Sequence, residues 1–324
     1  MVVTSLPSLS SASDYYSQAF SIFNQCSDQK IASKNWYSKK LPDIVGKSEH
    51  LAVLSIGCGN GDVDAYLITE LLIPNCVSLI YHGIEPNRSH RDKFLNKLLS
   101  HNSKAQRKSP LVIHDIPVEG CSYKDNEVLL FDCSFEALTS LGESWSQRYD
   151  VIIAGHSLYF VKDLLKSLDV MLKQLVVPNG CILITHTTPA DFQCSEEVVK
   201  INGSSPLHHV QIMQEICNVL ESNPHFNGTS VSELYSNQCI IQPQVNDLFV
   251  DVSECLTSEN KNPELEIGLM SFLFGIDFRS AEPVVLERMR AILRRQSINL
   301  QNSKWVLWQP EAVIAVNISR HNIF

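Results

Sequence analysis

The stretch that decides the fold is Leu54-Ser55-Ile56-Gly57-Cys58-Gly59-Asn60-Gly61-Asp62. It belongs to an apolar run that starts at Leu51, passes through three glycines at alternate positions, and leads into a helical pattern from Asp62. Glycine is needed where a backbone turns tightly or approaches a ligand too closely for a side chain, and the start of a helix offers free N–H donors. The stretch therefore predicts a ligand-binding loop between a buried strand and a helix, and a plain tight turn is the alternative.

Strand and helix patterns alternate after this loop. Apolar runs typical of buried strands occupy residues 51–56, 77–84, 128–131, 150–154 and 181–185. Helical patterns occupy residues 62–72, 89–100, 135–141 and 161–175, a turn is expected at 178–180, and residues 111–113 are either a further short strand or part of an insertion. The alternation predicts an α/β fold with a Rossmann-like, doubly wound and mostly parallel sheet.

The regions that flank this core have other patterns. Residues 1–13 are rich in serine and predict a disordered tail, and residues 14–50 predict an N-terminal helical segment on the substrate side, with a helix over 14–40 that ends at Leu41-Pro42. We assign residues 51–190 to the core and residues 191–324 to remaining strands and inserted substrate-side helices. In that last part the expected helices are 207–222, 263–275 and 281–296, and the expected strands are 238–241, 248–252, 305–308 and 312–318.

The composition disfavours several classes of function. The net charge of −9 disfavours a nucleic-acid partner, because phosphate contacts need a basic surface. No apolar run approaches the roughly 20 residues that span a bilayer, and the first residues do not have the pattern of a signal peptide. The ten cysteines form no Cys-x-x-Cys pair, and the histidines lack the spacing of metal ligands. We expect a cytoplasmic protein with reduced thiols, no metal and no membrane partner, which acts on a small molecule as a monomer or weak dimer.

The spacing of the glycines distinguishes two kinds of cofactor. A dinucleotide fingerprint has its third glycine at the sixth position, where this chain has Asp62. The spacing of Gly57, Gly59 and Gly61 is instead typical of methyltransferases that use S-adenosylmethionine. Glu85 ends the next strand, close to the interval of about 20 residues at which an acidic side chain accepts hydrogen bonds from ribose hydroxyls. A solvated strand end is the alternative for Glu85.

Two further strand ends carry candidate cofactor groups. The third strand ends in Phe131-Asp132-Cys133-Ser134, where the side chain of Asp132 or Ser134 could reach an adenine amino group. Ser134 is equally suited to cap the helix that follows. The fourth strand ends at Gly155, whose backbone would lie along the cofactor at the carboxyl edge of the sheet.

Together these segments resemble the histamine N-methyltransferase family. The resemblance is carried by the glycine loop, by Glu85-Pro86, by residues 150–163 (DVIIAGHSLYFVKD) and by residues 39–46 (KKLPDIVG), and it is weak beyond residue 190. It implies a class I methyltransferase that converts S-adenosylmethionine to S-adenosylhomocysteine. The cofactor residues that it implies are Gly57, Glu85, His90, Ser134 and Gly155.

The positions that hold the amine substrate in that family carry different residues here. They fall on Gln29, His156 and Pro310, and Asp28, Gln309 and Glu311 lie next to them as substitutes. The resemblance also implies an aromatic wall that could hold a cation; its members are Tyr16, Phe20, Tyr159, Phe160 and Phe272. Ordinary core packing is the alternative for Tyr16 and Phe20.

The expected reaction is methyl transfer to a nitrogen of a small amine or imidazole metabolite. An unperturbed histidine titrates near pH 6.5, so His156 is the candidate base, or else only a hydrogen-bond partner. Asp28 and Gln29 would hold a cationic group, although an exposed carboxylate at a helix end is an equal alternative for Asp28. Transfer to oxygen or sulfur of another small metabolite is a second hypothesis, and an inactive cofactor-binding partner protein is a third.

Overall fold

The computed structural model describes residues 6–9, 13–104, 112–114, 126–140, 145–188, 192, 195–202, 216, 218, 244–257, 262–300 and 304–317. They form two compact units that are interleaved along the chain. The sheet unit contains Ser33–His186, Ile212–Gln244 and Val313–Phe324, and the helical unit contains Met1–Ala32, Thr187–Gln211 and Val245–Ala312. The segment predicted over residues 14–50 is thus divided between the units after Ala32.

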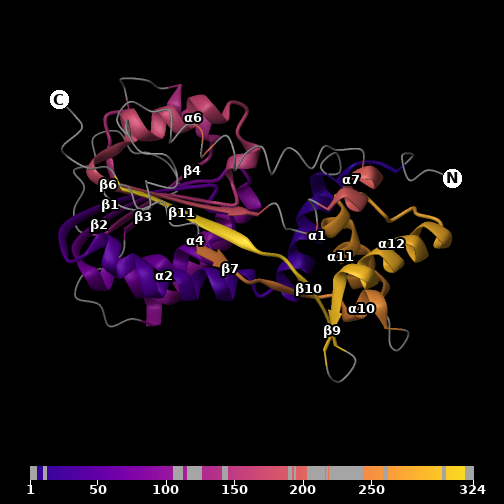
Figure 1. The fold of residues 1–324 in the computed structure, drawn as a ribbon. Helices are drawn as coiled ribbons and strands as arrows, with labels where there is room; N and C mark the ends of the chain where they lie inside the picture. Colours follow the sequence, from indigo (N-terminus) through magenta and orange to yellow (C-terminus); the bar gives the residue numbers. More distant parts are fainter. Residues whose placement is uncertain are drawn as a thin grey trace. The chain divides into compact units, whose positions relative to one another are not determined.

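An eight-stranded sheet forms the centre of the sheet unit (Figure 1), with the strands in the order β3-β4-β2-β1-β5-β6-β11-β7. The pairings of β1 with β2 and β5, of β4 with β2 and β3, and of β5 with β6 are all parallel. The strands are β1 Ser48–Ile56, β2 Cys76–Ile84, β3 Val112–His114, β4 Glu127–Phe131, β5 Tyr149–Gly155, β6 Val176–Thr187, β7 Gln244–Asn246 and β11 Glu311–Asn317. The predicted mostly parallel α/β sheet is confirmed.

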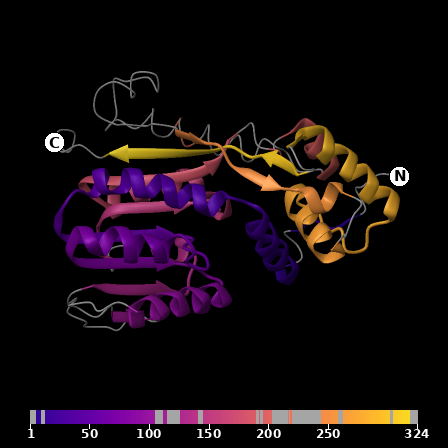
Figure 2. The same ribbon diagram turned by 90° about the horizontal axis from the view of Figure 1, so that it is seen from below.

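Helices cover both faces of this sheet (Figures 1 and 2). One face carries α2 (Gln29–Val45), α3 (Asp64–Tyr66) and α4 (Arg88–Lys104), and the other carries α5 (Phe135–Thr139) and α6 (Leu164–Val170). Successive residues of a strand point to opposite faces, so Val53 packs in one core cluster and Leu54 in the other. Burial on both faces explains why the strands read as continuous apolar runs.

The helix predicted over residues 14–40 is two helices, α1 (Ser13–Cys26) and α2, and α2 continues past Leu41-Pro42 to Val45. The expected end was wrong because Pro42 lies in the last turn of α2. A proline lacks an N–H, but its carbonyl can still accept the hydrogen bond that closes this turn. The Gly46 N–H donates to the Pro42 carbonyl at 3.0 Å, and Gly46 has a φ of +60°, the left-handed conformation with which glycine ends helices.

The turn expected at residues 178–180 is part of β6. Tyr149 of β5 pairs with Val176, but Val151 pairs with Cys181, so the register shifts between them. Asn179 has a φ of +70° in this stretch. The Pro-Asn-Gly sequence therefore makes an irregularity within the strand instead of separating a helix from it.

The remaining predictions differ mainly in length. The helix expected over 62–72 becomes α3, a π-helical turn over Leu67–Leu72 and a 3₁₀ turn over Ile73–Asn75. The helix expected over 161–175 becomes α6 followed by a π-helical turn over Met171–Leu175. The uncertain segment at 111–113 contributes strand β3. The strand at 238–241 lies outside the described residues, as does the helix at 207–222 except for residues 216 and 218.

The helical unit has its own core. Its helices are α1 (Ser13–Cys26), α7 (Glu196–Asn202), α10 (Ser253–Leu256), α11 (Pro263–Phe274) and α12 (Pro283–Gln296). Its antiparallel sheet has the order β8 (Phe249–Asp251), β10 (Trp305–Trp308), β9 (Ser297–Asn299). Residues 6–9, expected in a disordered tail, pack here, because Leu9 is buried and its N–H donates to the Gly275 carbonyl at 2.9 Å.

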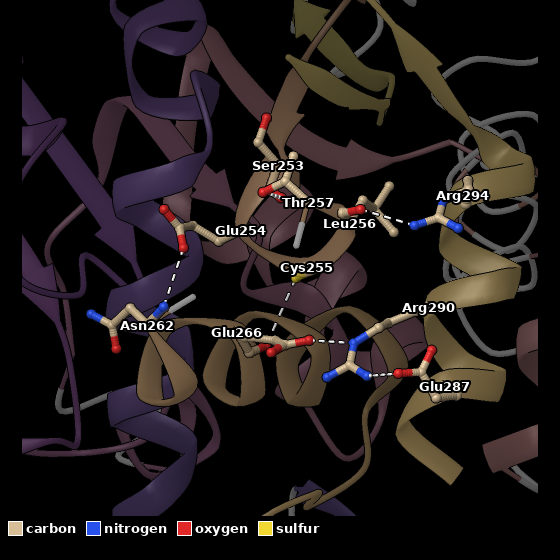
Figure 3. Close-up of polar contacts among 10 residues, drawn as sticks. All are labelled: Ser253, Glu254, Cys255, Leu256, Thr257, Asn262, Glu266, Glu287, Arg290 and Arg294. Atoms are coloured by element: carbon tan, nitrogen blue, oxygen red, sulfur yellow. Dashed lines mark hydrogen bonds and ion pairs between the residues drawn. The ribbon is translucent and has the colours of Figure 1, made fainter. Parts of the chain in front are cut away.

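Polar contacts join three helices of this unit (Figure 3). The buried Glu266 of α11 accepts a hydrogen bond from Arg290 of α12, which also donates to Glu287. Arg294 of α12 donates to the Leu256 carbonyl in α10 at 2.9 Å. A buried carboxylate needs such a partner, so the pair of Glu266 with Arg290 joins α11 to α12, and the Arg294 contact joins α12 to α10.

Candidate functional site

β1 lies where the order of the strands changes direction. Its neighbours are β2 on one side and β5 on the other, and the chain winds away from it both ways. In sheets of this kind, ligands bind outside the carboxyl ends of the strands at such a point. The loops that follow β1 and β5 meet here, because a Cβ built on Gly57 would lie 2.6 Å from the Cβ of Ser157. The glycine loop therefore occupies the edge at which the sequence predicted a ligand.

The three glycines of the loop serve different needs. Gly57, Gly59 and Gly61 have φ angles of +69°, +56° and +71°, a region that other residues rarely adopt. A Cβ on Gly57 would overlap Ser157, and one on Gly61 would lie 2.1 Å from the Phe94 ring. A Cβ on Gly59 would meet no atom within 4 Å, and the same is true of Gly155 after β5. Protein packing thus requires Gly57 and Gly61, whereas Gly59 and Gly155 leave backbone open at the sheet edge.

Glu85 is buried at the end of β2 and holds the glycine loop. One carboxylate oxygen accepts from the Gly59 N–H at 2.9 Å, and the other accepts from the Asn87 N–H at 2.8 Å. The His90 Nδ1 atom lies 3.8 Å from the second oxygen. An ionised carboxylate has about four acceptor positions, so Glu85 keeps the capacity to accept two more hydrogen bonds. A pair of neighbouring hydroxyls on a ligand would use that capacity.

Arg91, which the sequence analysis did not single out, connects the ends of two strands. It is 3 % exposed, and its Nη1 atom donates to the Glu85 carbonyl and to Asp132 Oδ1, at 2.7 Å each. Its Nη2 atom lies 2.6 Å from Asp132 Oδ2, which completes a bidentate pair. The sequence gives no signal that an arginine in the first turn of α4 is buried.

Asp132 and Ser134, the two candidates after β4, are both engaged by the protein. The pair with Arg91 fixes the direction of the Asp132 carboxylate. The Ser134 hydroxyl accepts from the Ala137 N–H at 3.3 Å and caps α5. Helix capping, one of the two roles expected for Ser134, is therefore present, and an additional contact with an adenine stays a prediction.

A buried cluster of polar side chains joins the elements that flank the glycine loop. The Asp64 carboxylate, at the start of α3, accepts from the Ser55 hydroxyl at 2.6 Å and from the Tyr81 hydroxyl. Burial raises the pKa of Asp64 and raises that of Tyr81 well above its usual value. These residues join β1, β2 and α3 around the loop. Asp64 is not predictable from the sequence, because an acidic residue in a first helical turn is usually exposed.

The end of β5 has a strained backbone. His156 has a φ of +51°, and its N–H donates to the Thr185 carbonyl of β6 at 2.9 Å. The next residue, Ser157, is 7 % exposed, and its hydroxyl has no hydrogen-bond partner among the described residues. Unusual backbone of this kind is commonly held at ligand sites.

Comparisons with known proteins concern the fold. The chain is similar to the YcgJ protein of Bacillus subtilis, at 12 % identity over 89 % of this chain and 98 % of that one, with a TM-score of 0.44. It is similar to the plantazolicin methyltransferase BamL, solved with a desmethylplantazolicin analogue and S-adenosylhomocysteine, at 14 % identity over 94 % and 91 %, with a TM-score of 0.44. No protein-family model and no curated protein matches the sequence.

The fold is Rossmann-like. This assignment rests on the parallel pairings and on the strand order. The chain is also similar to the precorrin 8w decarboxylase of Methanobacterium thermoautotrophicum, at 13 % identity over 85 % of this chain and 86 % of that one, with a TM-score of 0.37.

The aromatic residues expected around the substrate form one group in each unit. In the helical unit, the ring centroids of Tyr16 and Phe20 lie 6.3 Å apart, and those of Phe20 and Phe272 lie 5.5 Å apart. The Phe272 ring also stacks on Phe23 of the core. Phe20 and Tyr16 each pack against a cluster of buried residues, which agrees with the alternative of core packing for these two. In the sheet unit, Tyr159 and the exposed Phe160 are 4.5 Å apart.

The polar substrate candidates of the helical unit have structural contacts. The Asp28 Oδ1 atom accepts from the Phe249 N–H at 2.7 Å, so this carboxylate fastens β8 to the turn before α2. The Gln29 N–H donates to the Ser27 hydroxyl at 3.1 Å, and the buried Gln309 donates its N–H to the Leu248 carbonyl at 2.9 Å. These contacts leave a role in substrate binding as a prediction for all three.

Two further properties bear on the range of functions. Within the part of the chain that the structure describes, no three His, Cys, Asp or Glu side chains are grouped so as to hold a metal ion. Over the same residues, every helix is too short or too polar to cross a membrane.

Proposed function

We propose that this protein transfers the methyl group of S-adenosylmethionine to a small molecule. The observation that carries the proposal is the glycine loop at the switch point of the sheet, joined to Glu85 by the hydrogen bond from Gly59. The Gly-x-Gly-x-Gly spacing and the resemblance to a methyltransferase family support the same cofactor. A nucleoside fits better than a dinucleotide, because the sixth position of the loop is Asp62 instead of glycine.

The order of the strands suggests how the cofactor would lie. The row β4-β2-β1-β5 presents Asp132 and Ser134, then Glu85, then the glycine loop, then Gly155. Adenine would lie near the end of β4, and the ribose hydroxyls would bind Glu85 beside His90. The open backbone at Gly59 and Gly155 would leave room for the rest of the molecule. Arg91 would act indirectly, by holding Glu85 and Asp132 at a fixed separation.

The acceptor that we propose is a nitrogen of a small amine or imidazole-type metabolite. Bound S-adenosylmethionine supplies an already activated methyl group, so the residues of this chain mainly have to orient the nucleophile and exclude water. His156, at the end of β5, would remove or hold the proton of the nitrogen. Tyr159 and Phe160, in the same unit as His156, would contact the remainder of the acceptor.

Turnover with labelled cofactor tests this proposal. We expect formation of S-adenosylhomocysteine with amine and imidazole acceptors, and little with phenols or thiols of similar size. Replacement of His156 by Ala should lower the rate about 100-fold, in the range of general base catalysis. Faster transfer to phenols or thiols would replace the proposed acceptor. Cofactor binding without turnover, even with cell extract as the acceptor, would indicate an inactive binding protein.

A further inference from the structure

The Ser157 hydroxyl is buried at a helix start without capping it. Ser157 precedes the 3₁₀ turn Leu158–Phe160 in the N-cap position, but its side chain accepts no capping hydrogen bond. Ser134 and Asp163 occupy the corresponding positions before α5 and α6, and each accepts from a backbone N–H three residues on. Serine is favoured at an N-cap because of that bond, so capping does not explain the residue at 157.

Leaving this hydroxyl without a partner is costly to the folded protein. Ser157 is 7 % exposed, and its Oγ atom is shielded from solvent and has no partner among the described residues. Buried polar groups in folded proteins are almost always hydrogen-bonded, and an exception calls for an explanation such as a ligand. An alanine would fill the position without that cost.

The position of Ser157 shows which part of a ligand it would meet. Its Cβ packs against Gly57, and its Oγ lies 3.5 Å from the place of a Cβ on that glycine. The hydroxyl thus lies where the loops after β1 and β5 meet, three strands along the row from β4. Neighbouring strands are about 4.8 Å apart, so these ends are separated by about 14 Å.

We infer that Ser157 binds the amino-acid end of the cofactor. This inference rests on the proposed function: if adenine lies at β4 and ribose at β2, the carboxylate and ammonium groups of the cofactor extend toward β1 and β5. The hydroxyl donates to the carboxylate or accepts from the ammonium group. Either contact gives the buried Oγ its missing partner, so the free protein is less stable than an alanine variant while the bound protein gains affinity.

Two ligands and two variants test the inference by calorimetry. S-adenosylhomocysteine carries the amino-acid end, whereas 5′-methylthioadenosine is the same nucleoside without it. We expect Ser157→Ala to weaken binding of S-adenosylhomocysteine about tenfold or more, as for loss of a hydrogen bond to a charged group, and to leave binding of methylthioadenosine unchanged. The midpoint of thermal unfolding of the free protein should rise. Ser167→Ala, which removes a buried hydroxyl from α6, is the matched control and should change neither affinity.

Each other result contradicts the inference in its own way. Equal affinity of wild type and Ser157→Ala for S-adenosylhomocysteine removes the contact, and an equal loss for both ligands moves it to the nucleoside. If Ser157→Ala does not fold, Ser157→Cys keeps the volume with a much weaker donor and must show the same selective loss. Failure of the wild type to bind either ligand would refute the proposed function itself, which separates the two hypotheses.

Discussion

Gly59 and Gly61 are two residues apart in one loop, and the structure gives them opposite tasks. A Cβ on Gly61 collides with the Phe94 ring, whereas a Cβ on Gly59 enters open space. We expect Gly61→Ala to lower the free energy of unfolding by about 2–5 kcal/mol, from the left-handed backbone and the overlap together. Gly59→Ala has only the backbone cost, about 1–2 kcal/mol.

We expect the variant with the smaller loss of unfolding free energy, Gly59→Ala, to be the one that loses binding. Gly59→Ala should abolish measurable binding of S-adenosylhomocysteine although it folds, because its methyl group enters the open space that the cofactor would occupy. Urea unfolding and calorimetry on both variants check this pair of expectations. Gly59→Ala with the affinity of the wild type would mean that no ligand approaches this backbone.

At the same scale, the sequence predicted the glycines and Glu85 but not the residues that hold them. Glycine spacing and an acidic strand end are visible in one dimension. Arg91, Asp64 and Ser157 look like ordinary surface residues of helix starts and loops, and only the folded chain buries them. Burial is set by residues distant in sequence, so no local pattern could have revealed it.

At the scale of the elements, His82 of β2 reaches Tyr149 of β5 across the strand between them. The His82 Nδ1 atom and the Tyr149 hydroxyl are 2.8 Å apart. Burial lowers the pKa of His82 to about 4. The folded state therefore resists protonation of His82. The stability that neutral His82 provides is fully present above the unfolded pKa of about 6.5, and it declines as the pH falls toward 4.

We expect the wild type to lose roughly 3 kcal/mol of unfolding free energy between pH 7 and pH 4 through this residue alone. Replacement of His82 by Gln should make the decline shallower by about that amount, whatever its effect at pH 7. His50→Gln, which changes an exposed histidine of β1, is the control and should leave the slope unchanged. Urea unfolding over this pH range measures both slopes, and parallel curves for His82→Gln and the wild type would contradict the assignment.

The order of strands and helices was predictable because parallel strands buried on both faces are continuous apolar runs. The ends of elements were less so. Pro42 is a strong local signal for the end of a helix, but the hydrogen bond from the Gly46 N–H continues the helix past it. The Pro-Asn-Gly sequence at 178–180 is a strong signal for a turn, but the pairing of β6 with β5 includes it in a strand. At 178–180 the pairing with a distant strand decides the structure, and a single sequence does not show that partner.

For the whole molecule, the account requires one nucleoside site at the carboxyl edge of the sheet unit. Several substrates are compatible with the acidic net charge, with a small-molecule acceptor and with the division of the aromatic candidates between the two units. They do not carry the central claim. That claim depends on the glycine loop and on Glu85, both of which belong to the sheet unit.

Calorimetric titration of the purified protein with S-adenosylhomocysteine tests this claim most directly. We predict saturable binding at one site per chain, weakened at least about tenfold by Glu85→Ala, which removes the acceptor for the ribose hydroxyls. Glu49→Ala, at an exposed position in β1, should bind as the wild type does. Absence of binding to the wild type, or equal affinity of Glu85→Ala, would contradict the account.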